Sequence, residues 1–413
     1  MDTTPKVLSL TARYVFPVAG PPLAGGCVTI RGERIVAVEP RPTGAAVDLG
    51  DVAILPGLVN AHTHLEFSRC ATPLGRAGTP LPDWIRLVIA ARRNAQNDPA
   101  AAIAQGLAEM LGGGTTAVGE IATSGWTEES LSAAPLDLTA YYELRGLQAE
   151  FVEARLDDAA QFVAQIPQGT RWRGGISPHA PYSVHPELFV GLVRLAVANH
   201  LPLAMHLAES REELTLLADG SGPFRALLEE LGVWEAAAIP HGTRPLSYLR
   251  LLAEAPRSLV IHGNYLDGEE IEYLAVHAER MSVVYCPRTH AYFGHERYQL
   301  ARLLALGASV ALGTDSRASN PDLSMLAEMR HVARAFPSLG PEIALNLGTL
   351  AGARALGRDA EIGTLEAGKL ANLTTVSLSA PAATDPHELL FDADLPVVAT
   401  YYRGVPVTTD RGT

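Results

Sequence analysis

The chain has 413 residues, with 32 lysines and arginines against 45 aspartates and glutamates, which gives a formal net charge of −13. Hydrophobic residues make up 47% of it and charged residues only 19%, whereas disordered chains combine low hydrophobicity with high net charge. The composition therefore predicts a folded protein with a large core and excludes a largely disordered one.

The charge balance and the cysteines also limit the partners and the compartment. An acidic chain lacks the basic surface that would neutralise phosphates, so we expect neither a nucleic acid nor an anionic membrane as partner. Residues 1–12 lack a basic segment followed by a long apolar one, which argues against a secretory signal. The three cysteines show no C-x-x-C spacing, which argues against a disulfide scaffold. We expect a cytoplasmic protein.

Both ends of the chain have the texture of short strands. From residue 6 to residue 55, β-rich pieces alternate with proline and glycine clusters, and the same pattern returns at 370–376 and 396–407. We therefore predict a small β-sandwich domain formed by residues 1–54 and 366–413.

The middle of the chain alternates between strand-like and helix-like patterns. Eight apolar runs read as strands, at residues 55–66, 115–121, 136–147, 174–179, 201–209, 258–266, 281–287 and 309–315. Helical patterns lie between many of them, for example at 82–94, 186–199, 268–278 and 322–335. Eight β/α repeats in residues 55–365 predict a (β/α)8 TIM barrel in the α/β class. A doubly wound open sheet is the alternative, but no G-x-G-x-x-G follows an early strand.

Polar residues gather where the predicted strands end, which is where a barrel builds its active site. The first strand ends in His62 and His64, and the strand period of two puts both side chains on one face. By itself the H-x-H pair fits either a metal site or two structural histidines. Further strand ends carry His206 with Glu209, His262 and Asp315. Because these ends converge on one barrel mouth, the set favours a metal site.

These motifs resemble the amidohydrolase superfamily, in its deaminase and chlorohydrolase branch, over essentially the whole chain. The resemblance rests on P-G-L-V-N-A-H-T-H from residue 56, H-A-P-Y-S from 179, H-L-A-E from 206, H-G from 262, C-P-R from 286, G-T-D-S from 313 and G-T-L-E-A-G-K-L-A-N-L from 363.

The resemblance implies a metal site and a ligand set. One divalent ion would be bound by four side chains, His62, His64, His206 and Asp315. Histidine and carboxylate ligands favour zinc, while iron(II) and manganese stay open. Dinuclear relatives commonly bridge two ions with a carboxylated lysine, but the only lysines here are Lys6 and Lys369. A lysine-bridged pair is therefore excluded, and we expect one ion.

Catalytic roles follow from the same resemblance. Asp315 would accept a proton from water, and Glu209 would move protons to a ring nitrogen and to the leaving amine. His262 would orient the water or polarise the carbon under attack. Glu209 could instead be a structural carboxylate, and His262 a histidine of the core.

Candidates for contact with a small-molecule substrate are less distinctive. His179 and Arg145 resemble substrate-contacting positions in adenosyl-compound deaminases, although Arg145 could equally pair with Glu143 or Glu66. His290 lies in a loop whose extra aromatic and imidazole groups could stack on a base. Glu66 belongs to the string N-A-H-T-H-L-E-F-S, which is similar to aminodeoxyfutalosine deaminases.

The favoured function is a metal-dependent deaminase that hydrolyses an exocyclic amine on a purine nucleoside-like or other heteroaromatic ring and releases ammonia, with aminodeoxyfutalosine as one candidate substrate. A chlorohydrolase or a cyclic amide or imide hydrolase could use the same ligands. A non-catalytic scaffold is disfavoured because scaffold relatives lose ligands, and here all four are present. Relatives often form dimers or larger assemblies, which leaves a homo-oligomer open.

Overall fold

The computed structural model describes residues 7–93, 98–123, 126, 135–166, 171–379, 385–391 and 394–407. Residues 1–6, 380–384, 392–393 and 408–413 of the predicted terminal domain, and residue 94 of a predicted helix, lie outside this part of the chain.

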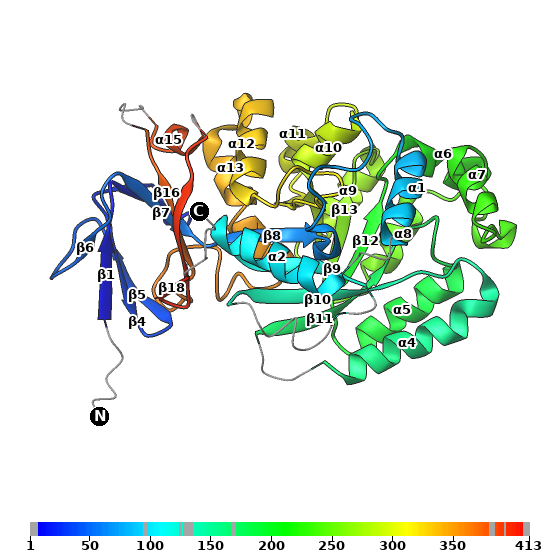
Figure 1. Ribbon diagram of the computed structural model, residues 1–413, viewed down its shortest axis with the longest axis horizontal. Helices are drawn as coiled ribbons and strands as arrows, with labels where there is room; N and C mark the ends of the chain where they lie inside the picture. The colour runs from blue at the N-terminus through cyan, green and yellow to red at the C-terminus, as the bar shows by residue number, and fades with distance from the viewer. Residues whose placement is uncertain are drawn as a thin grey trace.

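A sheet of eight parallel strands forms the larger part of the molecule (Figure 1), and the strands follow one another in chain order. The strands are β8 (Leu58–Thr63), β9 (Thr115–Ala122), β10 (Asp137–Leu144), β11 (Trp172–Pro178), β12 (Leu203–Leu207), β13 (Ser258–His262), β14 (Met281–Tyr285) and β15 (Ser309–Leu312). The ring closes beyond the end of β15, where the amides of Thr314 and Asp315 each donate to the carbonyl of His62 over 3.1 Å. The predicted TIM barrel is confirmed.

Helices surround this sheet and connect its strands. Their bounds are α1 (Leu81–Arg92), α2 (Pro99–Gly112), α4 (Val152–Ala164), α5 (Pro186–Ala198), α6 (Arg211–Asp219), α7 (Pro223–Glu230), α8 (Pro245–Leu252), α9 (Gly268–Val276), α10 (Pro287–Phe293), α11 (Leu300–Ala305), α12 (Met325–Ala335), α13 (Pro341–Leu347), α14 (Leu350–Ala355) and α15 (Glu388–Phe391). Short 3₁₀ turns occupy Leu65–Phe67, Ala149–Phe151, Ala236–Ala238 and Pro337–Leu339. Helix α12 starts later than predicted because the side chain of Ser324 caps it by accepting from the amide of Ala327.

The two ends of the chain lie side by side in two further sheets, seen as the blue and red strands of Figure 1. One sheet contains β1 (Val7–Thr11), β4 (Cys27–Arg31), β5 (Arg34–Glu39) and β6 (Val47–Asp48). The other contains β2 (Tyr14–Val15), β3 (Leu23–Ala24), β7 (Val52–Pro56), β16 (Leu373–Ser377), β17 (Val397–Tyr402) and β18 (Val405–Pro406). Apolar residues from both sheets, among them Leu10, Ile30, Ile54 and Leu373, form one shared core, as expected of a small sandwich.

The sequence predicted one strand over residues 55–66, and this prediction was wrong at both ends. Residues 52–56 form β7, which pairs with β16, and β8 begins at Leu58 and ends at Thr63. Gly57 separates the two strands. A Cβ atom at Gly57 would lie 2.1 Å from Oγ1 of Thr116, so only glycine lets the chain pass from one sheet into the barrel there.

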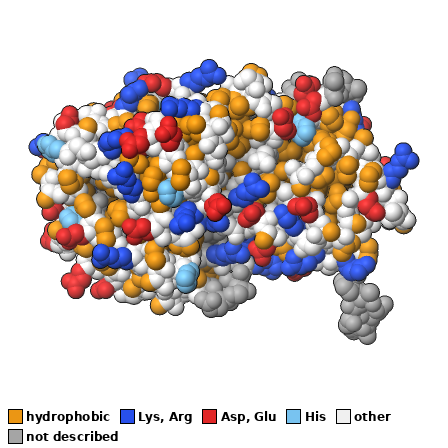
Figure 2. Space-filling model, turned by 180° about the vertical axis from the view of Figure 1, so that it is seen from behind, with side chains coloured by type: hydrophobic (Ala, Val, Ile, Leu, Met, Phe, Trp, Pro, Cys, Tyr) orange, Lys and Arg blue, Asp and Glu red, His pale blue; other side chains and the backbone are white. Residues whose placement is uncertain are grey.

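Charged side chains of both signs lie on the surface of the molecule (Figure 2). Acidic and basic side chains are interspersed over the face seen in Figure 2. No helix within the described ranges is long and apolar enough to cross a membrane.

Candidate metal centre

His62 lies in strand β8. Thr63 ends this strand, and His64 follows it directly at the barrel mouth. Asn60 fixes this strand end from within the barrel. Its Oδ1 accepts the amides of His62 over 3.3 Å and of Thr314 over 3.1 Å. The end of the first strand is thereby held against the end of the last one.

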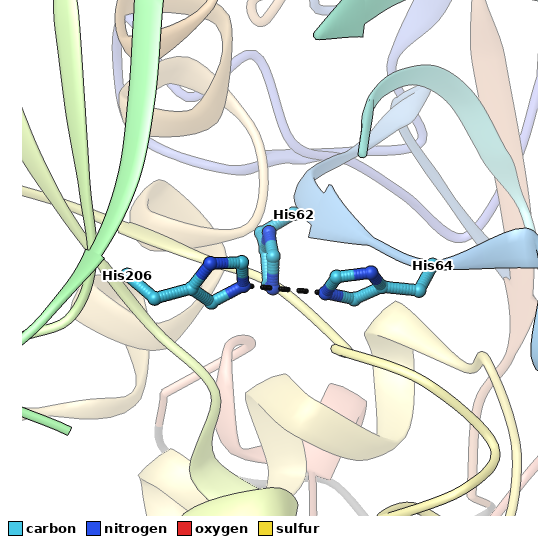
Figure 3. A group of neighbouring side chains, drawn as sticks. All are labelled: His62, His64 and His206. Atoms are coloured by element: carbon cyan, nitrogen blue, oxygen red, sulfur yellow. Dashed lines mark hydrogen bonds between the residues drawn. The ribbon is translucent and has the colours of Figure 1, made fainter. Parts of the chain in front are cut away.

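Three imidazole rings converge on one point (Figure 3). The Nε2 atoms of His64 and His206 lie 3.3 Å apart, and a ring nitrogen of His62 lies within 4.8 Å of both histidines. Oδ1 of Asp315 lies 3.6 Å from Nε2 of His62 and 3.6 Å from Nε2 of His64. The structure thus brings together all four side chains predicted as metal ligands.

Neighbouring groups aim these ligand atoms. Nδ1 of His206 lies 2.9 Å from the carbonyl of His179, so Nδ1 carries the proton and Nε2 keeps its lone pair for the centre. The hydroxyl of Ser319 donates to Oδ2 of Asp315 over 2.8 Å, which leaves Oδ1 facing the histidines.

The donor set fits a divalent cation. Both ring nitrogens of His62 are buried and have no hydrogen-bond partner, which is costly unless another group uses a lone pair there. Burial lowers the pKa of His62 and of His206 to about 3, and it lowers the pKa of His64 well below its usual range. Neutral imidazole is the form that binds metal. Three neutral imidazoles and a carboxylate match the ligands that zinc prefers.

Backbone strain is concentrated at the same strand ends. Ala208, His262 and Asp315 have φ values of 52°, 67° and 55°, in the left-handed region that residues other than glycine rarely adopt. Such conformations persist where the surrounding structure enforces them and cluster at functional sites.

Glu209 and His262 form a pair beside the ligands, with Oε1 of Glu209 3.4 Å from Nε2 of His262. Asn264 donates to the carbonyl of Glu209 over 2.9 Å, and the hydroxyl of Tyr298 donates to the carbonyl of His262 over 2.9 Å. Burial, followed by the nearby negative charge of Asp315, raises the pKa of Glu209 well above its usual range. This shift favours the protonated form of Glu209.

A cavity of about 330 Å³ opens onto this centre. One wall carries two ion pairs. Arg145 pairs with Glu143, and Arg92 pairs with Glu66 through Nη2 and Oε1 over 2.6 Å. The cavity therefore has a polar inner end that combines donors, acceptors and the candidate ligands.

The predicted substrate contacts are distributed unevenly. Arg145 and His179 line the cavity, and Nε2 of His179 faces Oε1 of Glu143 at 3.7 Å. Glu66 and His290 are absent from the described residues that line it. Glu66 lies behind Arg92, with which it is paired. His290, in α10, packs its ring against the rings of Tyr285 and Tyr298. Contact of these four residues with substrate stays a prediction.

Sequence reasoning did not assign roles to several buried groups near the centre. Ser319 lies four residues beyond Asp315 in a loop, and no motif marks it. The sequence indicates Glu143 only as a partner of Arg145. In the structure Glu143 also forms a second cluster of ligand-type atoms with His179 and His206. Glu120 accepts the amide of Leu65 with both carboxylate oxygens. The sequence alone gives no signal that a glutamate in a buried strand would accept this amide.

Comparison with known proteins places the chain in a family. A model of the amidohydrolase family matches residues 53–407. The chain belongs to the amidohydrolase family. This confirms the resemblance on which the ligand prediction rested, and it makes the protein a metal-dependent hydrolase of C–N bonds other than peptide bonds.

Individual relatives agree with this placement. The amidohydrolase is 30% identical over 406 residues to a 5-methylthioadenosine/S-adenosylhomocysteine deaminase of Moorella thermoacetica, with 91% of the chain and 86% of the relative covered. It is 29% identical over 380 residues to an aminodeoxyfutalosine deaminase of Deinococcus radiodurans, with 84% and 85% covered. Its structure is similar to that of an adenosine deaminase from Xanthomonas campestris with bound zinc, at a TM-score of 0.78 and 26% identity over 97% of the chain and 92% of that structure.

Proposed function

We propose that this amidohydrolase removes an exocyclic amine from a purine nucleoside-like or other heteroaromatic substrate and releases ammonia. The observation that carries the proposal is the pair Glu209 and His262 beside three converging histidines and Asp315 at the inner end of a cavity. The relatives support the substrate class, because their names describe deaminases of adenosine compounds and of aminodeoxyfutalosine.

One metal ion would be held by four side chains, those of His62, His64, His206 and Asp315. We propose that this ion is zinc. The similar Xanthomonas campestris structure with bound zinc supports this choice over iron(II) or manganese. A divalent cation held there would lower the pKa of a water molecule and so supply a nucleophile at neutral pH.

The chain's own groups then move the protons. Deamination adds water to the ring carbon that bears the amine and breaks its C–N bond. Asp315 takes one proton from the water and passes it to the departing amine. Glu209, protonated at the start, gives its proton to the ring nitrogen and regains one from the hydroxyl as the carbonyl forms. Ammonia leaves, and both carboxyl groups return to their starting states.

Two further groups position the reactants. His262 is neutral because burial lowers its pKa well below the usual range, so it can accept a hydrogen bond from the water or from protonated Glu209. Arg145 and His179 face the cavity, and we propose that they contact the substrate. The adjacent carboxylate of Glu143 holds Arg145 in place.

Replacement of Glu209 by glutamine tests the proposed proton transfer, because glutamine has the same size and cannot exchange a proton. We expect a loss of about 10²- to 10⁴-fold in kcat, with unchanged metal content. Ammonia release from adenosine compounds and elemental analysis would measure the two quantities. Glu212→Gln, three residues further along, is the matched control and should retain activity. Full activity of Glu209→Gln would remove Glu209 from the mechanism.

Product analysis separates deamination from the other hydrolyses open to the family. A panel should contain adenosine, adenosylhomocysteine, aminodeoxyfutalosine, guanine, cytosine and aminotriazines. Ammonia with an intact ring supports the proposal. Release of chloride from a halogenated ring, or ring opening of a cyclic amide, in place of ammonia would overturn it.

A further inference from the structure

A second pocket lies at the opposite end of the barrel from the metal centre. Its walls come from the segments where strands β10 to β13 begin, whereas the candidate ligands lie where strands end. These strands begin on the side of the barrel that faces the terminal sheets (Figure 1). The pocket has a volume of about 750 Å³, within the range of about 300–1,000 Å³ that is usual for small-molecule sites.

Arginines dominate the charge of this pocket. Four of them line it, and Glu361 is the one acidic residue among the described lining residues, although the whole chain has a net charge of −13. The arginines come from separate segments: Arg173 from β11, Arg257 from the residue before β13, Arg358 from the turn after α14 and Arg403 from the turn after β17. Their guanidinium groups thus reach the pocket from both the barrel and the terminal sheets.

The carboxylates that contact these arginines do not balance all of them. Three of the four arginines form ion pairs, and their partners are the carboxylates of Asp137, Glu361 and Glu33. Arg257 forms no ion pair within the described part of the chain, and its Nη1 donates to the carbonyl of Arg354. Four cations therefore face three carboxylates, which leaves one positive charge in excess.

Two buried donors at the pocket also lack an acceptor. Nε of Arg358 and Oγ1 of Thr139 form no hydrogen bond with any described residue, and both residues line the pocket. Arg358 is only 4% exposed and Thr139 only 1%, and buried polar groups of this kind nearly always have a partner. Burial lowers the pKa of Arg358 by more than Asp137 raises it, and the positive charge of Arg173 lowers it further. An anion in the pocket would relieve this loss of solvation.

A phosphate group matches this arrangement better than a carboxylate does. Its oxygens point in several directions, so it can accept from guanidinium groups of different segments at once. A planar carboxylate is served by the fork of a single arginine. Apolar residues beside the arginines, among them Leu201, Pro202, Pro256 and Leu356, could contact the organic part of a phosphate ester.

We propose that this pocket at the amino ends of the barrel strands binds the phosphate group of a small molecule, through Arg257 and the donors of Arg358 and Thr139. Arg257 supplies the positive charge that no carboxylate balances. The site is separate from the metal centre, so the proposal does not depend on the reaction catalysed there.

Calorimetric titration of the metal-loaded enzyme with inorganic phosphate and with ribose 5-phosphate tests the proposal. Neither probe has a purine ring that could bind at the metal centre. Arg257→Gln should weaken binding by about 10- to 100-fold, because a hydrogen bond between charged groups is lost. Thr139→Val, which keeps the shape of the side chain, should weaken it by about 3- to 10-fold. Arg41→Gln is the matched control and should retain the affinity, since Arg41 is exposed and lies outside the pocket.

Loss of affinity in both pocket variants, with Arg41→Gln unchanged, supports the proposal. Equal affinity for the two probes would mean that the phosphate group alone is recognised, and tighter binding of ribose 5-phosphate would add a contact with its organic part. Three results would overturn the proposal: no binding at millimolar concentrations, affinity that Arg257→Gln and Thr139→Val leave unchanged, or tighter binding of succinate than of phosphate. Should Arg257→Gln fail to fold, Thr139→Val decides alone, and its melting temperature should not fall because Oγ1 of Thr139 has no partner to lose.

Discussion

Replacement of Arg92 by methionine would remove the partner of a buried carboxylate and retain most of the side chain's apolar stem. Arg92 contacts Glu66 through two hydrogen bonds, Nη2 to Oε1 over 2.6 Å and Nε to Oε2 over 3.2 Å. The side chain of Glu66 is 8% exposed and that of Arg92 is 23% exposed. In the variant, Glu66 would be left as an unpaired charge with little access to water.

The expected cost follows from these exposures. Removal of one member of a fully buried ion pair costs about 3–5 kcal/mol, and partial exposure of Arg92 reduces this to about 2–3 kcal/mol. Unfolding entropy of about 2.1 cal/mol/K per residue amounts to roughly 0.9 kcal/mol/K for 413 residues. The melting temperature should therefore fall by about 2–3 °C.

Differential scanning calorimetry of Arg92→Met, Glu66→Gln, their double variant and Arg93→Met measures the effect. Arg93→Met, at the exposed neighbouring residue, is the matched control and should change the melting temperature little. The double variant Glu66→Gln with Arg92→Met should be more stable than Arg92→Met alone, because no charge stays buried without a partner. Equal losses for Arg92→Met and Arg93→Met, or a double variant that loses the sum of both single changes, would refute the reasoning.

Two further substitutions act on the candidate ligands. A Cβ atom at Gly313 would lie 2.8 Å from the carbonyl oxygen of His62, so Gly313→Ala should displace that ligand and lower both the melting temperature and the bound metal measured by elemental analysis. Gly44→Ala, where a Cβ atom meets nothing within 4 Å, should change neither, and equal behaviour of the two variants would contradict the packing argument. Ser319→Ala removes the hydroxyl that orients Asp315 and should weaken metal affinity by about 10- to 100-fold in competition with a chromogenic chelator. Unchanged affinity would show that Asp315 needs no such support.

The sequence alone was sufficient for the barrel and for the residues that converge at its mouth. Each strand appears as a local apolar run, and parallel strands all place their carboxyl ends at one rim. The positions of His62, His206 and Asp315 at strand ends are therefore enough to predict that these residues lie close together. This prediction does not depend on the details of side-chain packing. The absence of lysine between Lys6 and Lys369 likewise excluded a lysine-bridged pair of ions without any structure.

The boundaries of the strands were harder to predict from the sequence. Residues 55–63 read as one apolar strand because β7 and β8 have similar composition, and the hydrophobic pattern does not reveal which sheet each residue joins. The division at Gly57 depends on the close approach of Thr116, which lies 59 positions away in the chain.

The tertiary structure decided which charges are paired and which surfaces stay open. From the sequence, Arg145 could pair with Glu143 or with Glu66; in the structure it pairs with Glu143, and Glu66 is taken by Arg92, 26 positions further on. The apolar face of α1 packs Leu81 into the main core, and the same face also lines the cavity through Trp84 and Ile85. Periodicity states that a helix face is apolar, but only the packing of distant segments determines whether protein or ligand covers it.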